Sequence, residues 1–567
     1  MNKREKLKKI AIGVEDFKEI IDKDGYFVDK TLMIKKLIES RAKVTLFTRP
    51  RRFGKTLNQF MIRRFFEDER SEKGEKVDNG YLFEGLKIAE CGEEILKHQQ
   101  QYPVIFLTLK SAKQPTYEMA YACLVDEICK EFERHSYVLQ GEMSQRNREI
   151  FERISLGKGS DDEYATAFAF LSECLFKYHK KKAIILIDEY DVPLENAYFR
   201  GFYDEMIDFI RSLFESALKT NPYLEKSVIT GCLRISKESI FTGLNNLETD
   251  SVLHTRFGDS FGFTQEEVEG LLAYYDLSEQ LEEVKKWYDG YLFNDFEIYN
   301  PWSILKYVND RKDHVTEFAL PYWSNTSSNS IVREMVGEAD EMAKADLETL
   351  MAGGTIEKQV HEDITYGDIH QTQDNLWNFL FFTGYLKKVG ERTVGNNLWL
   401  EMKIPNIEIA TIYENSISYW FEQKIKATDR SPLVRALETG DCEAAEDFIN
   451  RQLADTISYY DYAETFYHGF MAGLLVNIGG YRVKSNRESG NGRPDIVMTE
   501  SKFRGRAMIL ELKISDTIQG MEKKCEEALT QMKEQKYESS LEDDGYQPIL
   551  KYAICFFKKG CMVKKAE

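Results

Sequence analysis

The chain has 567 residues, and its 76 Lys and Arg residues against 95 Asp and Glu residues leave a formal net charge of −19 at pH 7. A composition that is 43% hydrophobic and 13% aromatic excludes a disordered polyelectrolyte, and the length predicts about three or four domains at roughly 100–200 residues each. The sequence has no apolar run of the roughly 20 residues that a membrane span needs. No apolar segment follows the basic start, as a secretory signal would require. We therefore expect a soluble, cytoplasmic protein with no membrane partner.

The cysteine spacing and the charge distribution limit which metal sites, disulfides and binding partners the sequence favours. The nine cysteines include no C-x-x-C pair, which argues against a zinc site or a disulfide framework. The acidic total argues against nucleic acid, because phosphate binding depends on Lys and Arg. The charge is uneven, however: residues 41–66 contain eight basic side chains and no Asp or Glu, and a second basic cluster comprises Lys558, Lys559, Lys564 and Lys565. We expect nucleic-acid contact to be confined to such basic surfaces.

Short apolar runs alternate with longer amphipathic stretches through the first third of the chain. Such runs are typical of strands that are covered on both faces, and they lie at Lys43–Thr48, Pro103–Leu109, Ala183–Ile187 and Ser227–Thr230. The alternation predicts an α/β domain over residues 1–262, in which a parallel sheet carries helices on both sides.

The loop after the first strand, Arg49-Pro-Arg-Arg-Phe-Gly-Lys-Thr56, precedes a predicted helix from Lys55 to about Phe66. A phosphate chain needs backbone N–H groups at a helix N-terminus, a lysine for its terminal oxygens and a hydroxyl for Mg²⁺. The candidate nucleotide-binding residues are Arg52, Gly54, Lys55 and Thr56. The general P-loop pattern has glycine where this chain has Arg49, so a positive φ at that position would carry a cost. The alternative is a basic loop before an ordinary helix.

Two further strand ends supply the other parts of an ATPase site. The strand over residues 182–189 ends in Asp188 and Glu189. We expect Asp188 to hold Mg²⁺ together with Thr56, and Glu189 to act as a catalytic residue beside the attacking water. The strand that starts at Ser227 leads to Thr230 and Arg234, which we expect to sense the terminal phosphate, with Arg234 stabilising developing charge. A surface or salt-bridged arginine is the alternative for Arg234, and Arg256 is a weaker candidate.

Residues 263–440 predict a mostly helical linking or lid region, with helices at Thr264–Leu272 and Ser278–Trp287 and a weak strand signal at Gly384–Val389. Two aromatic segments in it, Trp287–Tyr291 and Tyr299–Trp302, flank Gly and Pro. Aromatic residues in that setting favour a packed turn between helices. Base stacking, or coupling between two active sites, is the alternative.

Residues 441–567 predict a unit of order αβββαβ. The expected elements are a helix from about Asp455 to Ile478, strands at Tyr481–Ser485, Asp495–Thr499 and Arg506–Ile514, a helix at about Ile518–Tyr537 and a last strand at Leu550–Phe557. This order can surround a cluster of charged side chains in the way that a metal-dependent nuclease core requires.

Charged residues inside this unit form a candidate nuclease site. Glu511 and Lys513 are two apart in a strand and therefore share a face, and Asp495 can lie beside them on a paired strand. Two carboxylates around a divalent ion, with a lysine to position or deprotonate water, can cleave a phosphodiester. We expect Glu464 as a further metal ligand and Gln531 as a residue that contacts phosphate or orients Lys513, with Tyr467 and His468 nearby. The alternative is a Glu–Lys pair on an exposed strand.

Several separated motifs resemble the bacterial AAA-ATPase-like family with a C-terminal PD-(D/E)XK nuclease domain. They are Gly25–Thr31, Leu46–Thr56, Leu186–Asp191, Thr230–Asn246, Trp287–Tyr291 with Tyr299–Trp302, and the pair Pro494-Asp495 and Glu511-Leu-Lys513. The resemblance implies a P-loop ATPase domain, a helical linking region and a restriction-endonuclease-like domain. It also implies that arginine is usual at the first loop position.

These observations predict an ATP-binding and ATP-hydrolysing nuclease that uses Mg²⁺ or Mn²⁺ to cleave DNA, an architecture that fits defence against foreign DNA. One alternative is a nucleotide-switched regulator whose nuclease-like domain only binds nucleic acid. Another is an RNase, because nothing in the motifs separates DNA from RNA. The sequence also leaves a homo-oligomer open.

Overall fold

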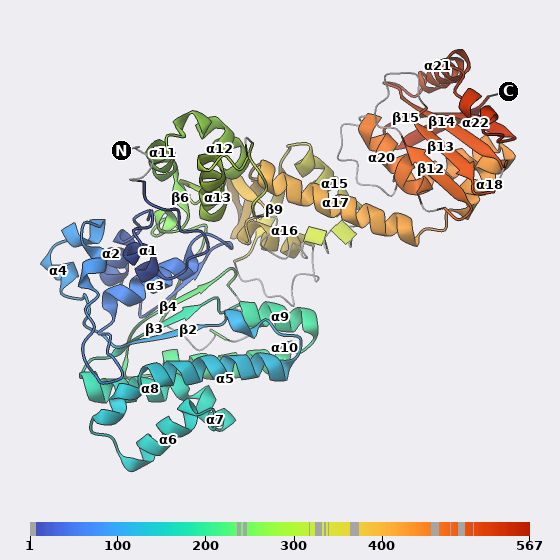
Figure 1. Ribbon diagram of the computed structural model, residues 1–567. Coiled ribbons are helices and arrows are strands. Elements are labelled where there is room, and N and C mark those ends of the chain that lie inside the picture. The colour runs from blue at the N-terminus through green and yellow to red at the C-terminus, as the bar shows by residue number, and fades with distance from the viewer. Residues whose placement is uncertain are drawn as a thin grey trace. The chain divides into compact units, whose positions relative to one another are not determined.

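The computed structural model describes residues 7–234, 240–241, 246–316, 318–323, 332–333, 336–337, 340–362, 373–454, 464–476, 478–485, 494–502 and 504–566. The chain divides into two compact units (Figure 1). The first comprises Met1–Ser328 and Thr355–Ile412, and the second comprises Asn329–Gly354 and Tyr413–Glu567. The domain boundaries expected after residues 262 and 440 stay predictions.

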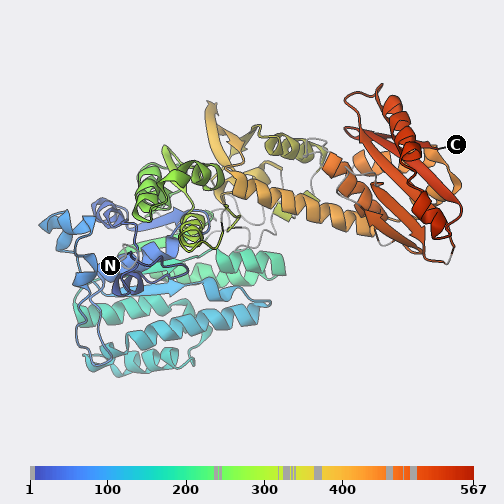
Figure 2. The same cartoon turned by 45° about the horizontal axis from the view of Figure 1, so that its top comes forward.

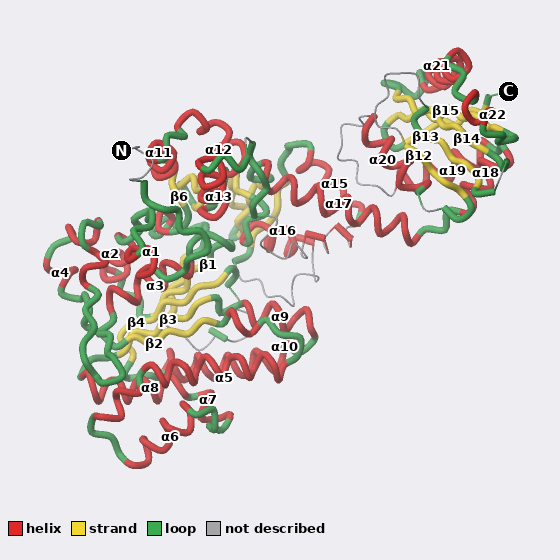
Figure 3. The backbone as a smooth tube through the Cα atoms, viewed as in Figure 1, coloured by secondary structure: helices red, strands yellow, loops and turns green. Residues whose placement is uncertain are grey.

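A five-stranded parallel sheet forms the centre of the first unit. Its strands run in the order β2-β3-β4-β1-β5, and their bounds are β1 (Val44–Thr48), β2 (Val104–Thr108), β3 (Ala183–Asp188), β4 (Leu224–Gly231) and β5 (Leu247–Asp250). Every residue of β1 and β3 is buried, as expected for strands covered on both faces. The sheet, drawn in yellow in Figure 3, confirms the predicted parallel α/β architecture, and β5 is a strand that the sequence did not indicate.

Helices cover this sheet on both faces (Figures 1 and 3). α3 has the bounds that the sequence predicted, Lys55–Phe66, and it packs against β3 and β4. The other helices of this part are α1 (Phe17–Asp22), α2 (Leu32–Glu39), α4 (Glu93–Leu96), α5 (Tyr117–Arg134), α6 (Gln145–Ser155), α7 (Asp161–Ala165), α8 (Ala167–His179), α9 (Val192–Arg200) and α10 (Tyr203–Phe214).

The rest of the first unit combines helices with two small antiparallel sheets. The sheet β6-β8-β7 joins β6 (Phe263–Thr264), β7 (Tyr291–Phe293) and β8 (Phe296–Tyr299), with helices α11 (Gln265–Tyr274), α12 (Leu281–Tyr288) and α13 (Pro301–Lys312). The sheet β10-β11-β9 joins β9 (Ile356–Val360), β10 (Lys387–Val394) and β11 (Asn397–Lys403), with α16 (Gln373–Phe382) against β9. The region is therefore helical as predicted, but it has more strands than the one weak signal indicated.

The two aromatic segments lie at the junctions of these elements. Trp287–Tyr291 leads from α12 directly into β7, so it is a turn between a helix and a strand and not between two helices. Asn300 begins α13, because its side chain accepts the backbone N–H groups of Trp302 and Ser303 at 2.9 and 3.4 Å. This cap satisfies donors that the first turn of a helix leaves unpaired.

A mixed sheet forms the centre of the second unit. Its order β12-β13-β14-β15-β16 follows the chain, and its strands are β12 (Tyr481–Ser485), β13 (Ile496–Glu500), β14 (Ala507–Ile514), β15 (Ile549–Phe557) and β16 (Gly560–Lys565). β14 and β15 are parallel, and the other neighbours are antiparallel. The predicted αβββαβ order is confirmed, and β16 is an additional strand after the one expected to be last.

Successive side chains of β14 point to opposite faces of the sheet and pack in two different hydrophobic cores. Met508, Leu510 and Leu512 pack in one core with helices α18 (Ser431–Thr439), α19 (Cys442–Ala454) and α20 (Glu464–Leu475). Ala507 and Ile509 pack in the other with α21 (Met521–Glu534) and α22 (Ser539–Asp543), and α21 lies along that face of the sheet in Figure 2. Of the helix expected over residues 455–478, residues 455–463 and 477 lie outside the described residues.

Two further helices complete the described structure. α15 (Glu341–Met351) belongs to the second unit, whereas α17 (Ile407–Ala427) begins in the first unit and continues into the second at Tyr413. No helix among the described residues is both long enough and apolar enough to span a membrane.

The first turn of α17 contains a buried carboxylate. Glu408 is 0% exposed, and its Oε1 accepts the backbone N–H of Trp323 at 2.8 Å. The Ser303 hydroxyl donates to its two oxygens at 2.8 and 3.0 Å. Burial raises the pKa of Glu408 to about 7, even though these donors act in the opposite direction. The carboxyl group is therefore more easily protonated in the folded protein than in the unfolded chain.

We expect Glu408→Gln to gain stability over the wild type as the pH rises. Between pH about 4.5 and about 7, Glu408 binds more protons in the folded protein than in the unfolded chain. Protonated Glu408 therefore contributes its full stability below pH about 4.5. That contribution is lost as the pH rises through about 7. The amide cannot ionise, so the free energy of unfolding of the variant relative to wild type should rise by up to about 3 kcal/mol between pH 4.5 and 8. Urea unfolding of both proteins at several pH values measures this difference.

Glu282→Gln is the matched control, because that side chain is 89% exposed. Its stability difference from wild type should not change with pH. A Glu408→Gln difference that is equally independent of pH would contradict the prediction.

Candidate functional site

The loop between β1 and α3 is shaped around the start of the helix. Gly54 caps α3 with a φ of 84°, and Arg52 also lies in the left-handed region with a φ of 70°. The Lys55 ammonium donates to the backbone carbonyls of Arg49 and Pro50 at 2.9 and 3.0 Å. The first N–H groups of α3 and the lysine are thus arranged as an anion site requires.

Arg49, where the general P-loop pattern has glycine, forms buried contacts that connect the loop to β5. It is not one of the left-handed residues of the loop, so the expected φ cost does not arise. Its guanidinium is 0% exposed, donates to the backbone carbonyl of Asp250 at 2.7 Å and forms an ion pair with the Asp250 carboxylate. Phe261 and Phe293 face the guanidinium at 5.0 and 5.3 Å from their ring centroids. Arg49 therefore ties the start of the loop to the end of β5.

Asp188 brings three of the predicted residues together. Its side chain is 0% exposed, and its two oxygens accept the hydroxyls of Thr56 at 2.8 Å and Thr230 at 2.7 Å. Burial raises the pKa of Asp188 despite these donors. A carboxylate and a threonine hydroxyl at the end of a P-loop are suitable groups for Mg²⁺, so the donor set fits the expected cofactor.

Residues after Asp188 hold the ends of β3 and β4 together. Glu189 has a φ of 53°, and its backbone N–H donates to the Thr230 hydroxyl at 3.3 Å. The buried Asp191 carboxylate accepts the backbone N–H groups of Cys232 and Leu233 at 2.7 and 3.2 Å, and burial raises its pKa to about 6. Left-handed backbone at a non-glycine residue persists only where the surroundings enforce it, and the contact with Thr230 holds the Glu189 backbone.

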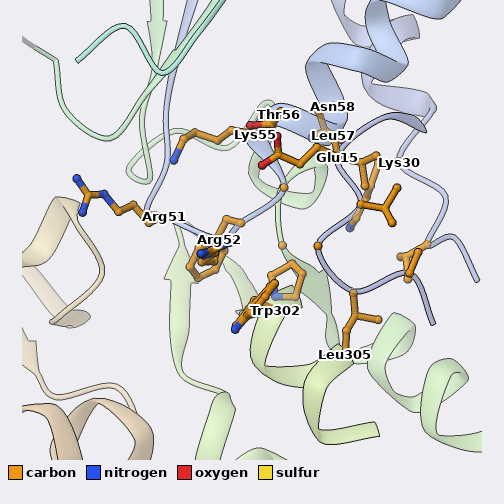
Figure 4. Close-up of a pocket in the computed structure, with 18 of the residues that line it drawn as sticks. Glu15, Lys30, Arg51, Arg52, Lys55, Thr56, Leu57, Asn58, Trp302 and Leu305 are labelled. Carbon is orange, nitrogen blue, oxygen red and sulfur yellow. The ribbon is translucent and has the colours of Figure 1, made fainter. Parts of the chain in front are cut away.

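A pocket of about 540 Å³ lies over the start of α3 (Figure 4). Its volume falls within the roughly 300–1,000 Å³ of small-molecule sites. The predicted residues Arg52, Gly54, Lys55, Thr56 and Glu189 line it. Arg234 and Arg256 are not among its described lining residues, and Arg256 pairs instead with Glu248 at 3.3 Å. The expected roles of Arg52, Thr230 and Arg234 toward phosphate stay predictions.

Segments distant in the sequence supply the apolar wall of this pocket. Among its lining residues are Val14, Tyr26, Phe27, Phe263, Trp302 and Leu305. The Arg52 guanidinium lies over the Trp302 ring, 4.4 Å from its centroid (Figure 4). The sequence suggested either a packed turn or a functional role for the Tyr299–Trp302 segment. In the structure, Asn300 of this segment caps α13, and Trp302 lines the pocket.

Lys110 is a pocket residue that the sequence analysis missed. It follows β2, lines the pocket, and places its ammonium 2.8 Å from Glu15 Oε1 and 3.7 Å from Asp188 Oδ2. A lysine directly after a buried parallel strand was the available signal, since such strand ends gather at one edge of a sheet.

The predicted nuclease residues of the second unit also come together. Glu511 and Lys513 lie on the face of β14 that packs against α21, and the Lys513 ammonium is 3.2 Å from Glu511 Oε1. Asp495 comes directly before β13, the neighbour of β14, and its Oδ2 accepts the backbone N–H of Leu512 at 2.8 Å. Asp495 is 3% exposed and Glu511 2%. The Lys513 side chain is 27% exposed, so Glu511 and Lys513 do not form the Glu–Lys pair on an exposed strand that the alternative interpretation requires.

The electrostatics of this pair suit a cation. Burial, and after it the charge of Asp495, raises the pKa of Glu511 to about 7. Glu511 Oε2 is buried and has no hydrogen-bond partner of close geometry within the described residues, and the Lys513 ammonium and the backbone N–H of Asp495 only partly offset the burial. Such burial is costly for a carboxylate. A divalent ion would remove that cost. The described residues contain no group of three His, Cys, Asp or Glu that could hold a metal, and the side chain of Glu464 lies outside the described residues.

The predicted residues Gln531 and His468 make different contacts in this unit. Gln531 on α21 donates from Nε2 to the Tyr537 hydroxyl at 3.0 Å. Burial raises the pKa of Tyr537 and the Glu511 charge adds to this shift, which marks the phenol as close to the carboxylate site. His468 Nε2 lies 3.3 Å from the backbone oxygen of Asp495, so it contacts the backbone of the site. The catalytic roles of Gln531, Lys513 and the carboxylates stay predictions.

Comparisons with known proteins match the two parts of the chain that contain these residues. Residues 11–241 match the family model described as "Predicted AAA-ATPase", and residues 462–566 match the PD-(D/E)XK nuclease superfamily. An uncharacterized protein encoded in the vnfD 5′ region of Azotobacter chroococcum mcd 1 is 24% identical over 550 residues, which cover 94% of this chain and 93% of that protein. No solved structure matches the chain significantly. Residues 11–241 are therefore similar to AAA-ATPase-like domains, and residues 462–566 are similar to PD-(D/E)XK nuclease domains.

We expect Arg49→Met to destabilise the first unit, because it leaves the Asp250 carboxylate buried without its partner. Breaking a buried ion pair from one side costs about 3 kcal/mol or more. Urea unfolding of the intact protein measures the loss. The double variant Arg49→Met/Asp250→Leu removes both charges and should recover most of it. Equal stability of the single variant and the wild type would contradict the role given to Arg49.

Proposed function

We propose that this protein is an ATP-hydrolysing, divalent-metal-dependent nuclease that cleaves phosphodiester bonds of DNA. The matched domains support an ATPase and a nuclease on one chain. The observation that carries the proposal is the buried Glu511 carboxylate, which pairs with Lys513 through one oxygen and has an unpartnered oxygen on the other side. A fold that only bound nucleic acid would have no reason to bear the cost of two adjacent buried carboxylates.

In the nuclease domain, Asp495 and Glu511 would hold the divalent ion. When bound, the ion would neutralise charge on the phosphodiester and so allow it to approach two carboxylates. Lys513 supplies a positive charge beside Glu511 and would orient the attacking water toward phosphorus. Gln531 on α21 donates to the Tyr537 hydroxyl, and these two side chains would limit the positions that a phosphate can take.

In the ATPase domain, the start of α3 and Lys55 would bind the phosphates, and Thr56 with Asp188 would hold Mg²⁺, which supplies charge neutralisation for phosphoryl transfer. Glu189 is the candidate to orient the attacking water, because its backbone N–H is bound by the Thr230 hydroxyl and Glu189 lines the pocket. Arg52 would approach the nucleotide from the side where it stacks on Trp302.

We expect Lys55→Ala to lose ATP turnover by about 100-fold or more, because a preorganised positive charge in the phosphate site is removed. Release of inorganic phosphate in the presence of Mg²⁺ measures this. Lys97→Ala, which removes a 56% exposed lysine in the same unit, should keep wild-type turnover. Unchanged turnover in Lys55→Ala would refute the P-loop assignment.

We expect Lys513→Ala to lose DNA cleavage by about 100-fold or more. Plasmid, linear duplex and single-stranded DNA, and structured RNA, are incubated with Mg²⁺ or Mn²⁺, with and without ATP, and EDTA should abolish cleavage. Lys551→Ala is the matched control: Lys551 lies on the neighbouring strand and pairs with Glu538 at 2.9 Å in a similarly shielded setting. Equal product release by wild type and Lys513→Ala would sink the nuclease assignment, and cleavage of RNA alone would overturn the substrate.

A further inference from the structure

Lys110 lies where the ends of two neighbouring strands meet. β2 and β3 pair in parallel with Thr108 opposite Asp188, and the backbone N–H of Leu109 donates to the Asp188 carbonyl at 3.0 Å. The next residue, Lys110, is therefore carried to the edge of the sheet at which Asp188 ends β3. It lines the same pocket as Lys55, Thr56 and Glu189.

The ammonium of Lys110 has two carboxylate neighbours. It is 2.8 Å from Glu15 Oε1, a side chain that is 55% exposed, and 3.7 Å from Asp188 Oδ2, which is fully buried. Burial alone lowers the pKa of Lys110, but the charges of Asp188, Glu189 and Glu15 outweigh it and raise the pKa. The side chain is therefore a permanent cation at neutral pH.

A bound metal–nucleotide complex changes the balance of these contacts. The Lys110 ammonium lies 3.7 Å from Asp188 Oδ2, so a cation held by Thr56 and Asp188 would repel it, because like charges interact strongly in a partly buried site. The contact with Glu15 binds the lysine weakly, because exposed ion pairs contribute little. Lys110 would therefore turn to the nearest uncompensated negative charge.

The terminal phosphate supplies that charge. In a P-loop site the threonine hydroxyl and the acidic strand end lie on the side of the β- and γ-phosphates, and Lys110 shares the Asp188 carboxylate with Thr56. A lysine on a flexible stem is suited to follow a phosphate oxygen over a short distance.

On the basis of the ATP site proposed above, we propose that Lys110 is a second phosphate-binding lysine that contacts the terminal phosphate of a bound nucleoside triphosphate and thereby discriminates it from a diphosphate. In the structure the same ammonium lies between the carboxylates of Glu15 and Asp188.

The test is nucleotide affinity measured by calorimetry on the full chain with Mg²⁺, using ATPγS and ADP as probes. Lys110→Met should weaken ATPγS binding by about 10- to 100-fold, the value of a charge-assisted hydrogen bond, and ADP binding by less than about threefold, because ADP has no terminal phosphate at that place. Lys110→Gln, which keeps a polar group for Glu15, should give the same selective loss, and Lys110→Arg should recover part of the affinity for ATPγS.

Lys130→Met is the matched control, since Lys130 also contacts two carboxylates, at 2.7 and 3.0 Å, but on the surface; it should bind both nucleotides as the wild type does. An equal loss of both affinities in Lys110→Met and Lys110→Gln would overturn the proposal in favour of a structural role. Unchanged or tighter ATPγS binding would overturn it in favour of a counter-ion for Asp188. If the wild type bound neither nucleotide, or Lys55→Ala bound both as well as wild type, the ATP site itself would fail, which is a different result.

Discussion

The arrangement of the strand ends and loops around the pocket at the start of α3 depends on one buried carboxylate. Asp188 ends β3 with 0% exposure, and its oxygens accept hydroxyls from α3 and from the neighbouring strand β4. A buried carboxylate is costly unless hydrogen bonds compensate it, so these donors hold three elements in a fixed relation. Once those ends are fixed, the loop before α3, the left-handed Glu189 and the lysine after β2 all face one pocket.

The carboxylates of the second unit differ from Asp188 in how they are compensated. Asp188 has a hydrogen-bond donor on each oxygen, whereas Glu511 has Lys513 on one oxygen and no donor on the other among the described residues. The hydroxyl donors of Asp188 offset part of the cost of its burial and fix its position. Glu511 is less fully compensated, so a cation would lower the cost of its burial more.

A continuous set of contacts links the P-loop to the start of α17 within the first unit. Arg52 stacks on Trp302, the next residue Ser303 donates to Glu408, and Asn406 donates to the backbone carbonyl of Asp289 at 2.7 Å. The two aromatic segments of the sequence are the source of Trp302 and Asp289. These segments therefore connect the loop before α3 with the start of α17.

The sequence by itself determined the elements whose physics is local. Buried runs predicted β1 to β4, the Gly54-Lys55-Thr56 pattern predicted the start of α3, and the spacing of Glu511 and Lys513 put both on one face of β14, because strand and helix periods act over a few residues. It could not determine the partners of those elements. The pairing of Arg49 with Asp250, the approach of Lys110 to Asp188 and the stacking of Arg52 on Trp302 join residues up to 250 positions apart. Only the tertiary structure decided these contacts. They depend on the order of the strands and on which buried charges need a partner, and a local sequence pattern encodes neither.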